Sequence, residues 1–212
     1  MSRGESIASR VAWPVAIDLL AALRPACERI EVAGSLRRGK SLVHDIELVA
    51  VAREEDRPEG MFGSVRVDLL EERLAAFVAN GYLSPRQVEA HRTGGRVEHV
   101  TRLGPAYKAL VDQTGIPIDL FIVRSPASWG CIFTLRTGPG DWNTRLVTDC
   151  KAIGRRVEGG RVQRYDGNGW VVVPTPEESS FLTALGQAWV EPVHRRAEAV
   201  RIDRAIADGA SA

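Results

Sequence analysis

Three carboxylates stand in or beside apolar stretches of this 212-residue chain, where a charged side chain is costly unless something compensates it. Asp45 and Glu47 are two residues apart at the start of the apolar run 46–52, and Asp119 interrupts a second run, 116–123. Since side chains alternate along a strand, the first two carboxylates are expected on one face, about 7 Å apart. Three acids placed this way form an oxygen-only ligand set suited to Mg²⁺.

A glycine-serine pair with two arginines precedes the first two acids. Gly34 lets the backbone approach a ligand closely, while Ser35 and Arg38 offer a hydroxyl and a guanidinium suited to phosphate oxygens. Enzymes of phosphoryl or nucleotidyl transfer combine such hydrogen-bond donors to phosphate with a carboxylate metal site. Each motif taken alone also fits a turn followed by a strand with a surface acid pair.

Taken together, these motifs resemble the signature of the DNA polymerase beta nucleotidyltransferase superfamily, and more narrowly the family X DNA polymerases. The glycine-serine pair, the arginines and the Asp-x-Glu motif occur in the family's order. The run 116–121 is similar to the strand that carries the third catalytic aspartate of that family. Trp129-Gly130, Thr137-Gly138 and Asn143 resemble its nucleotide-holding segment, and residues 173–192 resemble its closing thumb segment.

The resemblance implies a site in two parts. Asp45, Glu47 and Asp119 would be the catalytic residues and would bind two Mg²⁺ ions, with Mn²⁺ as a substitute, and Asp119 would also take the proton of the primer 3′-hydroxyl. The nucleoside triphosphate would be held by Gly34, Ser35, Arg38, Thr137, Gly138 and Asn143. The reaction would be in-line attack of the 3′-hydroxyl on the α-phosphorus with release of pyrophosphate, on a DNA primer-template or gapped DNA in repair.

Two departures from the family pattern bear on these expectations. Glu47 stands where the family usually has aspartate, so the metal geometry must shift. Leu135-Arg136 replaces the aromatic pair that helps to exclude ribonucleotides, which predicts weakened sugar discrimination. Two other functions stay open: a transferase of the same superfamily that acts on tRNA, a protein hydroxyl or a small molecule, and a non-catalytic nucleic-acid-binding module.

The elements that must position these residues follow an α+β order rather than a regular βαβ alternation. Strands are expected at 30–33, 46–52 and 116–123, with one or two more within 96–111 around a Gly104-Pro105 turn. A loop is expected at 53–60 and a hairpin ending at 173. Helices are expected at 14–28, 65–80, 144–153 and 181–185, with Pro14 in a first helical turn and Gly81 and Gly154 as stops. With the resemblance, the fold is an α+β nucleotidyltransferase palm with a mixed or antiparallel sheet, followed by a small α+β thumb.

This organisation predicts a palm at 1–125, a thumb-like lobe at 126–200 and a frayed tail at 201–212. The composition is that of a globular chain, with 28 basic and 27 acidic residues and a net charge of +1. A local basic excess at 136–164 is hidden in that sum. Three sparse cysteines indicate reduced thiols, and no apolar run is long enough to cross a membrane, so a cytoplasmic monomer is expected.

Overall fold

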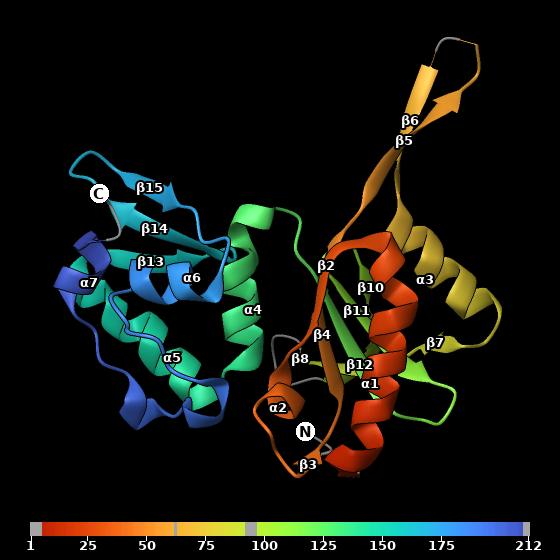
Figure 1. Cartoon of the computed structure of the whole chain (residues 1–212), viewed down its shortest axis with the longest axis horizontal. Helices are drawn as coiled ribbons and strands as arrows, with labels where there is room; N and C mark the ends of the chain where they lie inside the picture. Colours follow the sequence, from red (N-terminus) through yellow and green to blue (C-terminus); the bar gives the residue numbers. More distant parts are fainter. Residues whose placement is uncertain (1–5, 62, 92–96, 210–212) are drawn as a thin grey trace. The chain divides into compact units, whose positions relative to one another are not determined.

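The computed structural model describes residues 6–61, 63–91 and 97–209. They form an α+β protein with two compact units (Figure 1). Unit 1 comprises Met1–Val32 and Lys40–Arg124, and unit 2 comprises Ala33–Gly39 and Ser125–Ala212. The chain therefore divides at Arg124/Ser125, and a seven-residue segment far upstream of that division belongs to the second unit.

Unit 1 is built on a mixed six-stranded sheet with the order β10-β11-β12-β4-β2, and β7 also pairs with β11. The strands are β2 (Cys27–Val32), β4 (Ile46–Ala52), β7 (Leu83–Pro85), β10 (Leu103–Gly104), β11 (Tyr107–Asp112) and β12 (Pro117–Ile122). β12 runs parallel to β4, and the other pairings are antiparallel. The strands expected at 46–52 and 116–123 are confirmed, because both are nearly continuous buried runs.

Helices α1 (Ser9–Leu23) and α3 (Leu69–Ala79) cover one face of this sheet (Figure 1). The apolar stripe of α1, Ala12, Ala16, Leu19 and Leu23, is buried. This stripe begins a turn earlier than expected, so Pro14 lies inside the helix on its exposed side, and the prediction of a first-turn proline was wrong. The 3₁₀ helix η1 (Arg24–Ala26) follows α1. A two-stranded pairing of β1 (Ile7–Ala8) with β3 (Leu42–Val43) joins the start of α1 to the chain before β4.

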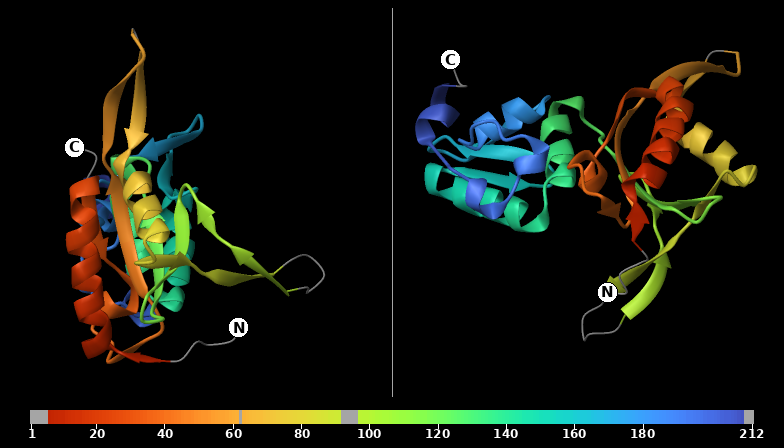
Figure 2. Two further views of the ribbon diagram at one scale, coloured as in Figure 1. Left: turned by 90° about the vertical axis from the view of Figure 1, so that its right-hand side faces the viewer. Right: turned by 60° about the horizontal axis from the view of Figure 1, so that its bottom comes forward.

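Two antiparallel hairpins project from the unit 1 sheet (Figure 2). The first pairs β5 (Glu54–Glu59) with β6 (Gly63–Asp68), and the second pairs β8 (Gln87–His91) with β9 (Val97–Thr101). The loop predicted at 53–60 and the helix start predicted at 65 were both wrong. Strand β5 is mostly charged and exposed, and the alternation of Val65 and Val67 in β6 leaves Val65 exposed to water. Cross-strand ion pairs such as Arg66–Asp56 connect the two strands.

Unit 2 packs helices against a three-stranded antiparallel sheet of β13 (Arg155–Glu158), β14 (Arg161–Tyr165) and β15 (Trp170–Val173). Its helices are α2 (Gly34–Arg37), α4 (Trp129–Thr137), α5 (Gly140–Asp149), α6 (Glu178–Ala184) and α7 (Arg204–Gly209). Four 3₁₀ helices complete the unit: η2 (Pro126–Ser128), η3 (Cys150–Ile153), η4 (Pro192–His194) and η5 (Ala197–Ala199). The core gathers Trp142, Leu146, Val162, Phe181 and Leu182, all less than 2% exposed.

Two expectations for unit 2 needed correction. The helix expected at 144–153 begins at Gly140 and ends in η3, where Gly154 adopts φ 71° as its left-handed C-cap. The tail expected to fray contains α7, which buries Ala207. Residues 210–212 of that predicted tail lie outside the described residues.

Candidate functional site

The carboxylates predicted to act together lie at the centre of the unit 1 sheet. Asp119 of β12 is the direct partner of Glu47 on the adjacent parallel strand β4, and Asp45 immediately precedes that strand. Direct partners in neighbouring strands point to the same face of a sheet. All three carboxylates are half-buried, whereas Ile46, between the two on β4, is fully buried. The alternation therefore presents the acids on the face opposite the helices.

Asp119 is held by two partners. Arg86, in the link between β7 and β8, places Nη2 2.5 Å from Asp119 Oδ1, and the Tyr107 hydroxyl donates to the same oxygen at 2.8 Å. Burial is the main cause that raises the pKa of Tyr107, and the charge of Asp119 raises it further. The hydroxyl therefore stays protonated and acts as a donor. The Tyr107 ring stacks on Phe121 with centroids 5.0 Å apart. Arg86 thus supplies the counter-charge that the sequence argument assigned to a metal ion.

The carboxylates nevertheless fit a divalent cation by their chemistry and strand positions. Glu47 and Asp119 are register partners, Asp45 is two residues away, and all their donor atoms are oxygens. Among residues 6–61, 63–91 and 97–209, however, no group of three or more His, Cys, Asp or Glu side chains is gathered closely enough to hold a metal ion. To ligate through Oδ1, Asp119 must therefore exchange its bonds with Arg86 and Tyr107.

The glycine-serine segment forms α2 in unit 2, not a loop of the sheet that carries the acids. Gly34 has φ 66°, a conformation that favours glycine, and it starts the short helix directly after an extended Ala33. Ser35 is half-buried. Arg38 places Nη1 2.5 Å from the carbonyl oxygen of Thr137 at the end of α4. Two of the predicted phosphate-binding and nucleotide-binding segments, 34–38 and 137–143, therefore contact each other within unit 2.

A buried ion-pair cluster anchors α2, and its members were absent from the predicted site. Glu178 of α6 pairs with Arg37 at 2.5 Å and with Arg195 at 2.9 Å. Arg37 also donates to Thr137 Oγ1 at 2.9 Å and stacks over the Phe133 ring at 4.2 Å. Burial raises the pKa of Glu178, but the hydrogen bonds and charges of the two arginines outweigh it and leave the pKa below its usual range.

Thr137, Gly138 and Asn143 meet where α4 turns into α5. The Asn143 Nδ2 group donates to the carbonyl oxygens of Leu135 at 2.7 Å and of Gly138 at 3.1 Å. A Cβ on Gly138 would lie 2.4 Å from Asn143 Oδ1 and 2.6 Å from the Trp142 ring, so glycine is needed there for close approach. In this arrangement Asn143 stabilises the end of α4.

Asn143 also lines a pocket of about 440 Å³ in unit 2. The lining includes Leu135 and Arg136 from α4, Thr144 from α5 and Gly160 from the β13–β14 turn. A few polar groups, here an amide, a guanidinium and a hydroxyl, among apolar side chains such as Ile132 and Val147 are features of small-ligand pockets. Trp142, next to Asn143 in the chain, is fully buried in the core of unit 2.

Four residues in the two candidate regions, the carboxylates of unit 1 and the α2–α4 contact of unit 2, were assigned no role from the sequence. They are Arg37, Arg86, Glu178 and Arg195. Arg86 and Asp119 are 33 residues apart, and Arg37 and Glu178 are 141 apart, so no local spacing relates them. The one available signal was the Arg37-Arg38 pair itself, of which only the second residue was assigned a function. Glu178 lay in the thumb-like segment without a role of its own.

Comparisons with known proteins do not assign this chain to a family. No protein-family model matches this chain, and no curated protein matches it. Across the described part of the chain, no helix is both long enough and apolar enough to pass through a membrane.

Proposed function

We propose that this protein is a metal-dependent nucleotidyltransferase that adds nucleotides to a DNA primer 3′-hydroxyl and releases pyrophosphate. The observation that carries the proposal is the register pairing of Glu47 with Asp119 on adjacent parallel strands, with Asp45 two residues before Glu47. Carboxylates at the centre of a sheet, on its helix-free face, are suited to two divalent cations. When bound, such ions would neutralise the triphosphate and activate the attacking hydroxyl.

The residues proposed to take part belong to both units and have different roles in each. In unit 1, Asp45 and Glu47 would hold the ions, and Asp119 would accept the hydroxyl proton once Arg86 releases its Oδ1. In unit 2, the guanidinium of Arg38 and the hydroxyl of Ser35 would orient the phosphates. Asn143 and the pocket beside it would hold the sugar and base. Charge neutralisation and positioning account for most of the rate in phosphoryl transfer, so each carboxylate should matter.

The test is primer extension on gapped, recessed and single-stranded DNA, with Mg²⁺ or Mn²⁺ and each nucleoside triphosphate. Asp119→Asn should lower the rate about a thousandfold, which corresponds to roughly 4 kcal/mol of lost transition-state stabilisation. Glu59→Gln is the matched control, because it removes the same charge from an exposed carboxylate of the β5–β6 hairpin. This control variant should extend primers at the wild-type rate.

The outcomes separate three functions. Templated extension that depends on Asp119 supports the proposal. Untemplated addition, or transfer only to RNA, a protein or a small molecule, would support another nucleotidyltransferase in its place. DNA binding without turnover under any metal would indicate a non-catalytic binding module. An Asp119→Asn variant as active as wild type would refute the assignment of the carboxylates.

A further inference from the structure

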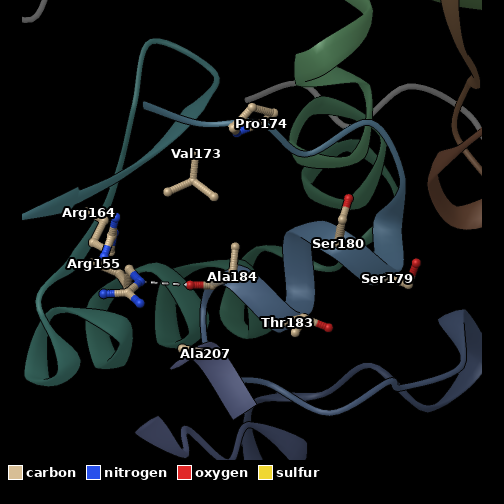
Figure 3. A pocket seen from close by; sticks show the side chains of 9 residues that line it. All are labelled: Arg155, Arg164, Val173, Pro174, Ser179, Ser180, Thr183, Ala184 and Ala207. Atoms are coloured by element: carbon tan, nitrogen blue, oxygen red, sulfur yellow. Dashed lines mark hydrogen bonds between the residues drawn. The ribbon is translucent and has the colours of Figure 1, made fainter. Parts of the chain in front are cut away.

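A second pocket, of about 320 Å³, lies in unit 2 between the three-stranded sheet and helix α6 (Figure 3). Two arginines, Arg155 of β13 and Arg164 of β14, lie together on one side of it, and Ser179 and Thr183 of α6 also line it. None of these residues belongs to the proposed site. The pocket therefore combines cationic and hydroxyl donors that the proposed reaction does not use.

The two arginines are direct cross-strand partners, Arg155↔Arg164. Their side chains share the sheet face that carries Val157 and Val162, and Val162 is fully buried in the core of unit 2. Like charges directly opposite each other destabilise a sheet. The face of this sheet that carries Val162 thus ends in a pair of like charges, of which Arg155 is buried and Arg164 is exposed at the pocket.

The protein compensates this charge only in part. Arg155, 5% exposed, donates to the carbonyl oxygens of Ala184 and Ile153 at 3.2 and 3.4 Å, and neither acceptor carries a charge. In the described part of the chain, the carboxylate that pairs with Arg155 is that of Asp208, at 3.3 Å, whose side chain is 59% exposed. Within the described residues, no carboxylate lies within ion-pair distance of Arg164, although its charge is among the causes that lower the pKa of the exposed Asp166. A direct ion pair therefore offsets only one of the two arginine charges, next to the neutral hydroxyl groups of Ser179 and Thr183.

We propose that this pocket binds a phosphate group between Arg155 and Arg164. A tetrahedral anion can accept charge-assisted hydrogen bonds from both guanidinium groups while Ser179 or Thr183 donates to another oxygen. The same chemistry is offered by free phosphate or pyrophosphate and by the terminal phosphate of a nucleic-acid strand. Binding of the free anions is independent of the proposed function, whereas binding of a strand rests on it.

The experiment uses the full chain and isothermal titration calorimetry at constant ionic strength, with chloride as the reference anion. The probes are inorganic phosphate, pyrophosphate, and one DNA oligonucleotide with and without a 5′-phosphate. Arg164→Ala is the test variant, because the side chain is exposed and its loss should not unfold the unit. Arg161→Ala is the control, because it removes the same charge from the same strand on the opposite face.

Arg164→Ala should weaken phosphate binding about tenfold or more, as expected for the loss of one charged hydrogen-bond donor, and Arg161→Ala should change it less than twofold. Preference for the 5′-phosphorylated oligonucleotide would identify a strand as the source, and binding of the free anions alone would identify a small anion. Equal weakening in both variants, or no wild-type binding tighter than about 1 mM for any probe, would overturn the inference. Phosphate binding without primer extension would refute the polymerase proposal and leave this site intact.

Discussion

The buried carboxylate of Glu178 leads to a quantitative prediction for the substitution Glu178→Gln. The glutamine keeps the size of the side chain but removes the charge that faces Arg37 and Arg195. The Arg195 side chain is completely buried and that of Glu178 is 7% exposed, so the guanidinium cannot recover its lost partner from water. Removal of one member of a buried pair costs about 3–5 kcal/mol, because an uncompensated charge stays behind. That is a large share of the roughly 5–15 kcal/mol that stabilises a typical protein.

Urea denaturation at pH 7, followed by tryptophan fluorescence, measures this loss. Four of the five tryptophans belong to unit 2, so the signal reports mainly on the unit that holds the ion pair. Glu158→Gln is the matched control. Glu158 also pairs with an arginine, Arg156, at 3.0 Å, but its side chain is 64% exposed, and its loss should cost no more than about 0.5 kcal/mol.

The pH dependence of the free energy of unfolding, compared between wild type and Glu178→Gln, gives an independent check. The pKa of Glu178 lies below its ordinary value of about 4.5 in the folded state, so the stabilisation from its charge is complete above that pH. It should be lost as the pH falls from about 4.5 through the folded-state pKa, and the advantage of wild type over Glu178→Gln should shrink with it. An advantage under about 1 kcal/mol at pH 7, or one that grows toward low pH, would refute the reasoning.

Two further predictions concern buried contacts of the same fold. Gly138→Ala should cost about 1–3 kcal/mol, since its Cβ would overlap Asn143, while Gly140→Ala has open space and should be neutral in the same thermal melts; equal losses in both would contradict this. Burial raises the pKa of all three thiols, to about 11 for Cys27 and Cys150 and about 12 for Cys131. A thiol reagent at pH 8 should therefore label none of them in the native protein and all three in denaturant.

The sequence predicted best the elements whose side chains are buried on both faces. The run Ile46–Ala52 became β4 with the same bounds, because seven residues dominated by apolar side chains have one stable place in a sheet. The predictions were wrong where a local sequence preference and a contact with a distant part of the chain favoured different structures. Pro14 suggested a helix start, but the buried stripe that begins at Ala12 extends the helix by five residues. In the β5–β6 hairpin, β5 has no apolar alternation, and the short alternation of Val65 and Val67 in β6 was predicted as the start of a helix.

The candidate site was predictable in its residue types more than in its contacts. The spacing of Asp45 and Glu47 predicted two carboxylates on one face of a strand, and the apolar run around Asp119 predicted a third carboxylate in another strand. The structure shows that these strands, β4 and β12, are neighbours in the sheet. The same reasoning treated Asp119 as an uncompensated charge. Arg86 supplies that compensation from a link with no motif, through a register that only the folded sheet defines.

The placement of Ala33–Gly39 in unit 2 imposes an order of events on a newly made chain. Arg37 leaves the ribosome 100 residues ahead of Thr137 and 141 residues ahead of Glu178, its two partners. At about 5–20 residues per second, the segment waits roughly 7–28 s before Glu178 exists. The strands that carry Glu47 and Asp119 are complete well before then. The carboxylates can thus be assembled early, while α2, which carries the Arg38 proposed to orient the phosphates, gains its anchor at Glu178 only when synthesis is nearly finished.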